Sequence, residues 1–138
     1  PLQRLRAVRE LVDAGVRAGV LMNPIVPGLT SRPALLERTV KAAADHGACF
    51  LGCNVMFLEG GTREHFMQWL ARNHADLVLG YERLYGGKYA AEAYRTAVSA
   101  TVQVLRGKYG LDRRASNDKG EASTPPAVRE ARQRLLNW

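Results

Sequence analysis

The sequence predicts an α/β protein in which two parallel strands are joined by one helix. Residues 16–23 and 48–58 are two mostly apolar stretches, and the residues between them repeat apolar side chains at helical spacing. Near-continuous apolar strands separated by a helix are typical of a buried parallel βαβ unit. In such a unit the loops after both strands lie at one edge of the sheet, which is where α/β folds bind ligands.

A helix is expected before this unit, with Gly15 as its stop. Its outer side is charged, so the helix is amphipathic. It would normally cover a strand upstream of Pro1, and we therefore expect a fragment of a longer protein. The apolar side chains that recur at helical spacing are Leu2, Leu5, Val8, Leu11 and Val12.

The first strand, residues 16–23, runs into a stiff loop at residues 24–29. Pro24 and Pro27 remove two backbone donors from this loop, and Gly28 permits a positive φ or a close backbone approach. The loop is therefore expected to hold one conformation.

The connecting helix is expected to begin after Thr30 or Ser31 as its N-cap and to end at Gly47. Pro33 falls in the first turn, where a missing N–H group costs little. The expected buried face comprises Leu35, Leu36, Val40, Ala43 and Ala44.

The second strand, residues 48–58, is apolar on both faces apart from Asn54. This pattern predicts a strand inside a sheet with helices on both sides. A turn at residues 59–61 follows, and Thr62 is the expected cap of the next helix, with Glu64 near its positive end. The apolar side of that helix comprises Phe66, Met67, Trp69 and Leu70.

Two more helices are expected, at residues 76–85 and 89–108, separated by Gly86-Gly87. Beyond residue 111 the composition shifts to polar residues, Gly and Pro, which predicts disorder over most of residues 111–138. We divide the chain into distal βα units (1–75), a helical extension (76–110) and a basic tail (111–138). The expected buried stripe of the long helix is Ala93, Tyr94, Ala97, Val98, Thr101 and Leu105.

Composition places the chain among soluble globular proteins. Of its 138 residues 46% are hydrophobic and 24% are charged. No apolar run approaches the roughly 20 residues that a membrane-spanning helix needs. Two cysteines and no secretory signal favour the reducing cytoplasm. The net charge of +7 suggests nucleic acid as a partner, although the basic residues are scattered, as on ordinary solvated helix faces.

The familiar catalytic and metal-binding patterns are weak in this sequence. Cys49 and Cys53 have metal-like spacing, but four positions along a strand span about 13 Å, too far for both thiolates to bind one metal ion at about 2.3 Å. Buried cysteines are the simpler interpretation. The three histidines, His46, His65 and His74, lie on different helices. A nucleophile elbow and a glycine-rich phosphate loop are absent from the sequence.

The strongest candidate site is the edge formed by residues 23–30 and 54–59. Its few polar groups include Asn23 and Asn54, and apolar residues such as Val26 and Met56 surround them. A mostly apolar wall with a few placed polar groups suits a purine or a similarly flat ligand. The alternative is that the Pro-Gly loop is merely a rigid strand-to-helix turn.

Four segments of the sequence carry a resemblance to a known family: LRAVRELVDAG (5–15), VLMNPIVPGLT (20–30), GTREHFMQWL (61–70) and YERLY (81–85). They resemble the C-terminal half of radical S-adenosylmethionine proteins, in particular the spore photoproduct lyase-like (DNA repair photolyase-like) branch. The resemblance covers roughly residues 2–110.

The resemblance implies a fold and a set of cofactor contacts. The fold would be the C-terminal part of a partial (βα)6 TIM-like barrel, with the two strands here as its fifth and sixth. In the family's fifth-strand motif, G-x-I-x-G-x-x-E, Val26 and Gly28 match, whereas Pro24 and Ser31 depart from the pattern. The implied contacts to S-adenosylmethionine come from Asn23, Val26, Gly28, Val55 and Met56.

The resemblance also implies a [4Fe–4S] cluster, which family members hold through three cysteines in one loop. Here Cys49-x-x-x-Cys53-x-x-Met56 has the spacing but lacks the third cysteine. We therefore expect no cluster ligands in this chain and a partner half, N-terminal and cluster-bearing, in the intact protein.

We expect the intact protein to cleave S-adenosylmethionine reductively to a 5′-deoxyadenosyl radical that removes hydrogen from an unidentified substrate. This chain would supply the adenine and substrate side of the cavity, since the cofactor carries the hard chemistry. The alternative is a non-catalytic basic module that associates with nucleic acid, for which added salt would steeply weaken DNA binding.

Overall fold

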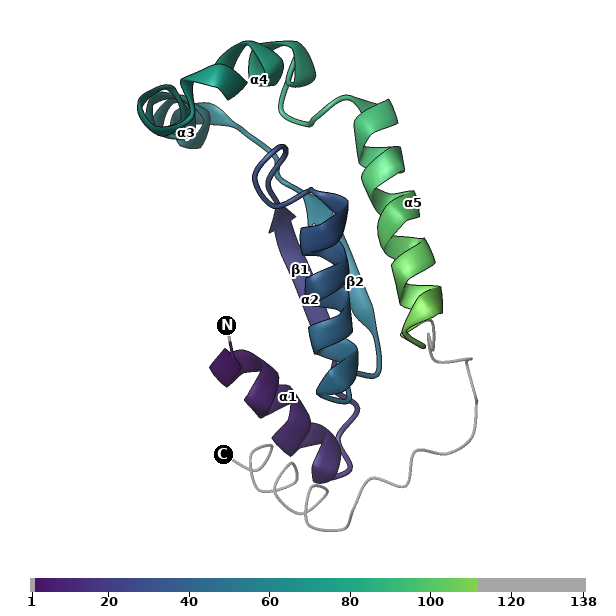
Figure 1. The fold of residues 1–138 in the computed structure, drawn as a ribbon. Helices are drawn as coiled ribbons and strands as arrows, with labels where there is room; N and C mark the ends of the chain where they lie inside the picture. The colour runs from purple at the N-terminus through teal and green to yellow at the C-terminus, as the bar shows by residue number, and fades with distance from the viewer. Residues whose placement is uncertain (1, 112–138) are drawn as a thin grey trace, which may run out of the picture.

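The computed structural model describes residues 2–111. Of the expected tail, residues 111–138, only Leu111 is described, and it is buried in the core rather than disordered; the rest lies outside the described residues. Two strands are surrounded by helices, and both strands point toward the same end of the molecule (Figure 1). In chain order the elements are α1 (Leu2–Asp13), β1 (Val20–Ile25), α2 (Pro33–Asp45), β2 (Leu51–Val55), α3 (Gly60–Asn73), the 3₁₀ helix η1 (Ala75–Leu77), α4 (Val78–Leu84) and α5 (Glu92–Lys108).

The parallel βαβ unit predicted from the sequence is confirmed. β1 and β2 pair in parallel, with Val20 opposite Leu51 and Met22 opposite Cys53. With the strands pointing up and α2 toward the viewer, β2 lies to the right of β1, which is the right-handed crossover (Figure 1). The register shifts between Met22 and Ile25, where Pro24 has no N–H group for the ladder.

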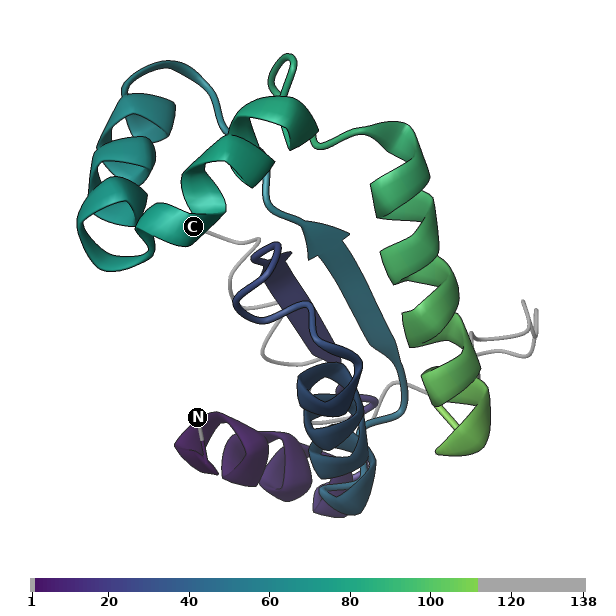
Figure 2. The same ribbon diagram turned by 45° about the horizontal axis from the view of Figure 1, so that its top comes forward.

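Helices α2 and α5 bury one face of the sheet, and α5 runs alongside β2 (Figure 2). The buried positions of α2 are Leu36, Val40 and Ala43, within the expected face. The stripe expected on α5 is partly wrong, because Ala93 and Ala97 are exposed. The residues that α5 buries are Val98, Val102 and Leu105.

The opposite face of the sheet is open in the described part of the chain. Leu21 is 65% exposed, and Asn23 and Asn54 are exposed as well. The prediction of helices on both faces is therefore wrong for residues 2–111. The prediction rested on the apolar character of both faces of the second strand. Some of the apolar residues in and next to the strands, such as Leu21 and Phe50, are exposed instead of covered.

Helix α1 lies at the margin of the core, against which its Val8 packs. It has no buried residue, and Leu2 is 63% exposed. A pocket of about 810 Å³ separates α1 from β1 and α2, lined mainly by apolar side chains that include Leu5 and Val8. Arg9 connects the two helices through a hydrogen bond from its guanidinium to the carbonyl of Asp45.

The first strand begins at Val20, and residue 16 is excluded from it because residues 15 and 16 belong to the end of α1. Gly15 has a φ of +81°. Its N–H group donates to Val12 and that of Val16 donates to Leu11. This pair of bonds is the Schellman motif, which satisfies the last carbonyls of a helix and turns the chain away.

Three helix starts also differ from the prediction. The N-cap of α2 is Arg32, not Thr30 or Ser31, and α3 begins at Gly60, before Thr62. The second strand ends at Val55, and α5 begins only at Glu92. Phe57 and Tyr89, which both fall outside the regular elements as a result, form an antiparallel bridge with each other.

None of the helices within residues 2–111 is long and apolar enough to cross a membrane.

The contact between α2 and the end of α5 predicts a pH dependence of stability. Glu37 accepts hydrogen bonds from Lys108 (2.5 Å) and from the Tyr109 hydroxyl (2.8 Å). These bonds hold the pKa of Glu37 below its usual value. A carboxyl whose pKa is lower in the folded state stabilises the fold above its unfolded pKa, and this contribution disappears as the pH falls through the folded pKa.

Glu37→Gln should therefore lower the midpoint of thermal unfolding at pH 7. On acidification, the midpoint of the variant should fall less than that of the unchanged protein. Calorimetry between pH 7 and pH 3 measures both effects. Glu82→Gln, at an exposed carboxylate on α4, is the matched control. An acid dependence of Glu37→Gln equal to that of the unchanged protein would contradict the prediction.

Candidate functional site

The ends of both strands lie at one edge of the sheet, next to α3, η1 and α4 (Figure 1). The loop after β1, residues 26–31, and the segment after β2, residues 56–59, meet there. Met56 donates its N–H to the carbonyl of Ile25 at 2.9 Å, which joins the two segments directly. The edge predicted from the sequence is therefore a real feature of the fold.

The loop after β1 satisfies its own backbone donors. Leu29 and Thr30 both donate N–H groups to the carbonyl of Val26, at 3.2 and 2.9 Å. The N–H of Val26 donates to the Thr30 hydroxyl (2.8 Å), and that of Gly28 donates to the Ser31 hydroxyl (2.9 Å). These bonds explain why neither hydroxyl caps α2, since both are engaged within the loop.

The segment after β2 carries an aromatic pair. The rings of Phe57 and Tyr89 lie 6.2 Å apart, and the Lys88 ammonium lies 5.3 Å from the centre of the Phe57 ring. Lys88 also pairs with Glu59 at 2.6 Å. The hydrogen bond to Glu59 raises the pKa of Lys88. Phe57 and Tyr89 are each 54% exposed, and the Lys88 ammonium also lies 5.6 Å from the centre of the Tyr89 ring.

A pocket of about 550 Å³ lies between the end of β2 and the first turns of α5. Of the five residues expected to contact a cofactor, Asn23 and Val55 line it. Val26, Gly28 and Met56 do not line it and lie in the two loops instead. The remaining lining residues are Cys53, Asn54, Phe57, Tyr89, Glu92, Arg95, Thr96, Val98 and Ser99.

The wall contributed by α5 was not predicted. Its polar residues, Glu92, Arg95, Thr96 and Ser99, follow the spacing i, i+3, i+4 and i+7. This spacing places them on one side of the helix, next to the apolar stripe. A polar stripe at helical spacing is a signal that the sequence contains, but it does not indicate that β2 lies opposite.

The position of the Arg95 guanidinium is fixed at the pocket. Its Nε donates to the carbonyl of Ala90 at 3.0 Å, and the guanidinium carbon lies 5.6 Å from the centre of the Tyr89 ring. A cation that lies against the face of an aromatic ring is attracted to it electrostatically. The pocket thus combines aromatic rings, two amides (Asn23 and Asn54) and charges of both signs.

This arrangement can bind and orient a small polar ligand that carries a flat ring. Cys53 is half-buried, and burial raises the pKa of its thiol, which disfavours the nucleophilic thiolate. Cys49 lies before β2 rather than within it. Within residues 2–111 no group of three or more His, Cys, Asp or Glu residues could hold a metal ion.

The positive φ of Gly28 (+73°) yields a test of the loop. A Cβ atom there would meet Leu77 only at ordinary contact distance, so the expected cost of Gly28→Ala is conformational. The left-handed conformation costs a residue with a side chain about 1–2 kcal/mol. Gly28→Ala should lower the free energy of unfolding in urea by about this amount.

Gly80→Ala is the matched control. Gly80 lies inside α4 with open space around it, and alanine favours a helix over glycine by about 1 kcal/mol. The two substitutions should therefore change stability in opposite directions. A Gly28→Ala protein as stable as the unchanged one would contradict the described loop.

Comparison with known proteins yields relatives without an assigned function. The chain is 34% identical over 129 residues to uncharacterized proteins of Mycobacterium bovis and Mycobacterium tuberculosis. The match covers 91% of this chain and 38% of each relative, so the chain spans less than two fifths of their length. No family model matches the sequence, and no solved structure matches it.

Proposed function

We propose that this chain is the distal part of a radical S-adenosylmethionine enzyme and forms the adenine and substrate side of its cavity. The observation that carries the proposal is the pocket between the end of β2 and the first turns of α5, lined by Asn23, Asn54 and Phe57 among others. S-adenosylmethionine is proposed as the ligand because residues 20–30 resemble the family's fifth strand.

A partial (βα)6 barrel would account for two uncovered surfaces of the described chain, the open face of the sheet and the exposed helix α1. A barrel strand buries one face under helices and turns the other toward the interior. Here α2 and α5 cover one face, and Leu21, Asn23 and Asn54 point away from it. We infer that the open face lines the barrel interior and that the exposed α1 packs against an earlier unit.

The pocket fits S-adenosylmethionine in its chemistry. Phe57 and Tyr89 offer aromatic faces to adenine, and the amides of Asn23 and Asn54 can hydrogen-bond its ring nitrogens. Arg95 and Glu92 can pair with the carboxylate and the ammonium of the methionine moiety. Val26 and Met56, in the adjoining loops, would border the adenine.

The described residues do not fit an iron–sulfur cluster, because they contain no group of ligands for it. Cluster ligands would have to come from another part of the intact protein. The contribution of this chain is to bind S-adenosylmethionine, to orient it and to exclude water from one side of the cavity. Nucleic acid as a partner stays a prediction from the charge of +7.

Phe57→Ala should weaken the binding of S-adenosylmethionine by about tenfold, since stacking of a base on an aromatic ring contributes about 1–3 kcal/mol. Isothermal titration calorimetry measures the dissociation constant. Phe50→Ala is the matched control, because Phe50 is similarly exposed (44%, against 54% for Phe57) and precedes β2, at the opposite end of the strand. Equal loss of affinity in both variants would count against the pocket.

The mass and the iron and sulfide content of the intact protein, isolated anaerobically from its source, test whether it is a radical enzyme. A mass well above 15.2 kDa, with bound iron and sulfide, is the expected result. A mass of 15.2 kDa without iron would rule out radical chemistry by this polypeptide.

A further inference from the structure

Two buried tyrosines, Tyr81 on α4 and Tyr85 at its C-cap, connect the end of this helix to both strand-end segments. They are four positions apart in the chain, and they lie on the same side of the helix end. Their rings stack, with centroids 5.6 Å apart and planes inclined by 12°. They are 3% and 1% exposed.

Each hydroxyl donates to a different segment. The Tyr81 hydroxyl donates to the carbonyl of Pro27, after β1, at 2.6 Å. The Tyr85 hydroxyl donates to the carbonyl of Met56, after β2, at 2.7 Å. The end of α4 is therefore hydrogen-bonded to both of the segments that follow the strands.

Both hydroxyls remain donors over the whole physiological range. Burial raises the pKa of Tyr81 well above its usual value of 10, and it raises the pKa of Tyr85 to about 12. A protonated hydroxyl can donate to a carbonyl, whereas a phenolate cannot.

The helix that carries this pair is itself held firmly. Tyr81 and Tyr85 belong to a second core with Leu58, Leu70 and Ala90. Arg63 of α3 donates to the carbonyls of Tyr85 (2.8 Å) and Gly87 (2.9 Å) at the end of α4. The two tyrosines are therefore held by core packing and by the hydrogen bonds of Arg63.

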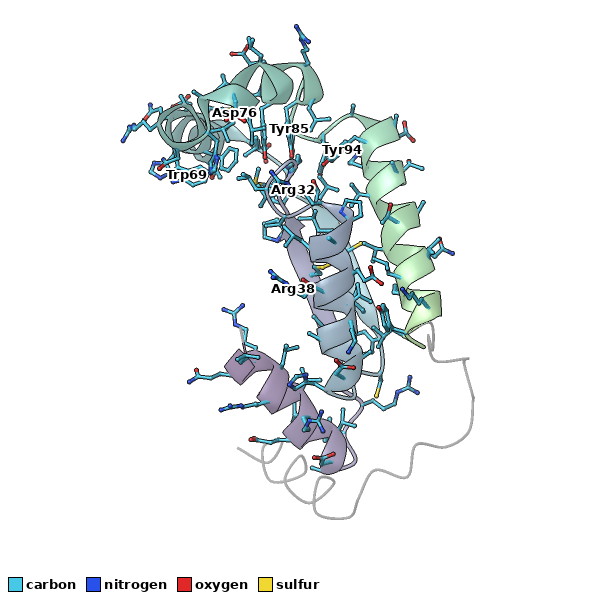
Figure 3. The ribbon with its side chains drawn as sticks, viewed as in Figure 1. Arg32, Arg38, Trp69, Asp76, Tyr85 and Tyr94 are labelled. Atoms are coloured by element: carbon cyan, nitrogen blue, oxygen red, sulfur yellow. The ribbon has the colours of Figure 1, made fainter. Side chains whose placement is uncertain are left out.

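A third tyrosine holds the first loop from the other side. The Tyr94 hydroxyl of α5 donates to the Ser31 hydroxyl at 2.9 Å, and the same oxygen accepts the N–H of Gly28. Figure 3 shows Tyr85 and Tyr94 projecting from α4 and α5 toward the segment that contains Arg32. The loop is therefore restrained at Pro27 from α4 and at Ser31 from α5.

We propose that Tyr81 and Tyr85 are positioning residues that fix the two strand-end segments in the geometry needed to bind the ligand. Neither tyrosine lines the pocket. Tyr85 acts through Met56, whose neighbours Val55 and Phe57 line the pocket, and Tyr81 acts through Pro27, which follows Val26 in the adjoining loop. This proposal rests on the proposed function for the identity of the ligand. The alternative role is simpler: the hydroxyls satisfy two buried carbonyls and have no effect on binding.

Phenylalanine substitutions separate these roles, because they keep the stacked rings and remove only the hydroxyls. In the intact protein, Tyr81→Phe should speed amide hydrogen exchange in residues 26–31, and Tyr85→Phe should speed it in residues 56–58. Each variant should weaken S-adenosylmethionine binding by about five- to tenfold, as expected for the loss of one hydrogen bond.

Tyr109→Phe is the matched control. Tyr109 also donates a hydrogen bond of 2.8 Å, to Glu37, but it lies at the far end of α5. It should change neither the exchange of the two segments nor the affinity. Circular dichroism of each variant checks that the fold is retained.

Two results would overturn the proposal: unchanged exchange in both segments of the Tyr81→Phe/Tyr85→Phe protein, or faster exchange with unchanged affinity. If the unsubstituted protein does not bind S-adenosylmethionine, the proposed function fails. Hydrogen exchange then still decides whether the tyrosines position the segments.

Discussion

The parallel pairing of β1 with β2 determines the arrangement of everything else in the described chain. Because α2 returns the chain to the starting end of the sheet, the segments after both strands meet at one edge. Helices α3, η1 and α4 then assemble beyond that edge, and α5 runs back along β2. The candidate pocket exists because this return brings the first turns of α5 against the end of β2.

Two hydrophobic cores support this edge from different directions. One lies between the sheet, α2 and α5, and the other lies among α3, η1 and α4. Val55 and Tyr94 pack against both cores, so they connect the two parts of the fold. Val55 also lines the pocket, and a change at this position is therefore expected to affect packing and binding together.

The sequence was sufficient to predict the βαβ unit, because apolar runs and helical spacing are local signals. The start of β1 was misplaced because hydrogen bonds at Gly15 and Val16 end α1, and an apolar run does not reveal them. The N-cap at Ser31 was wrong because its hydroxyl binds within the loop. The α5 wall of the pocket and the contacts of Tyr81 required the three-dimensional structure, since they join residues far apart in the chain.

The hydrogen bonds within residues 26–30 leave this loop with few free backbone donors. Phosphate recognition by a loop depends on several free N–H groups that converge on the anion. In this loop Pro27 has no N–H group, and those of Val26, Gly28, Leu29 and Thr30 are all engaged. The loop therefore offers no nest of free amides to a phosphate group, and any anion bound at this edge would have to pair with side chains such as Arg95.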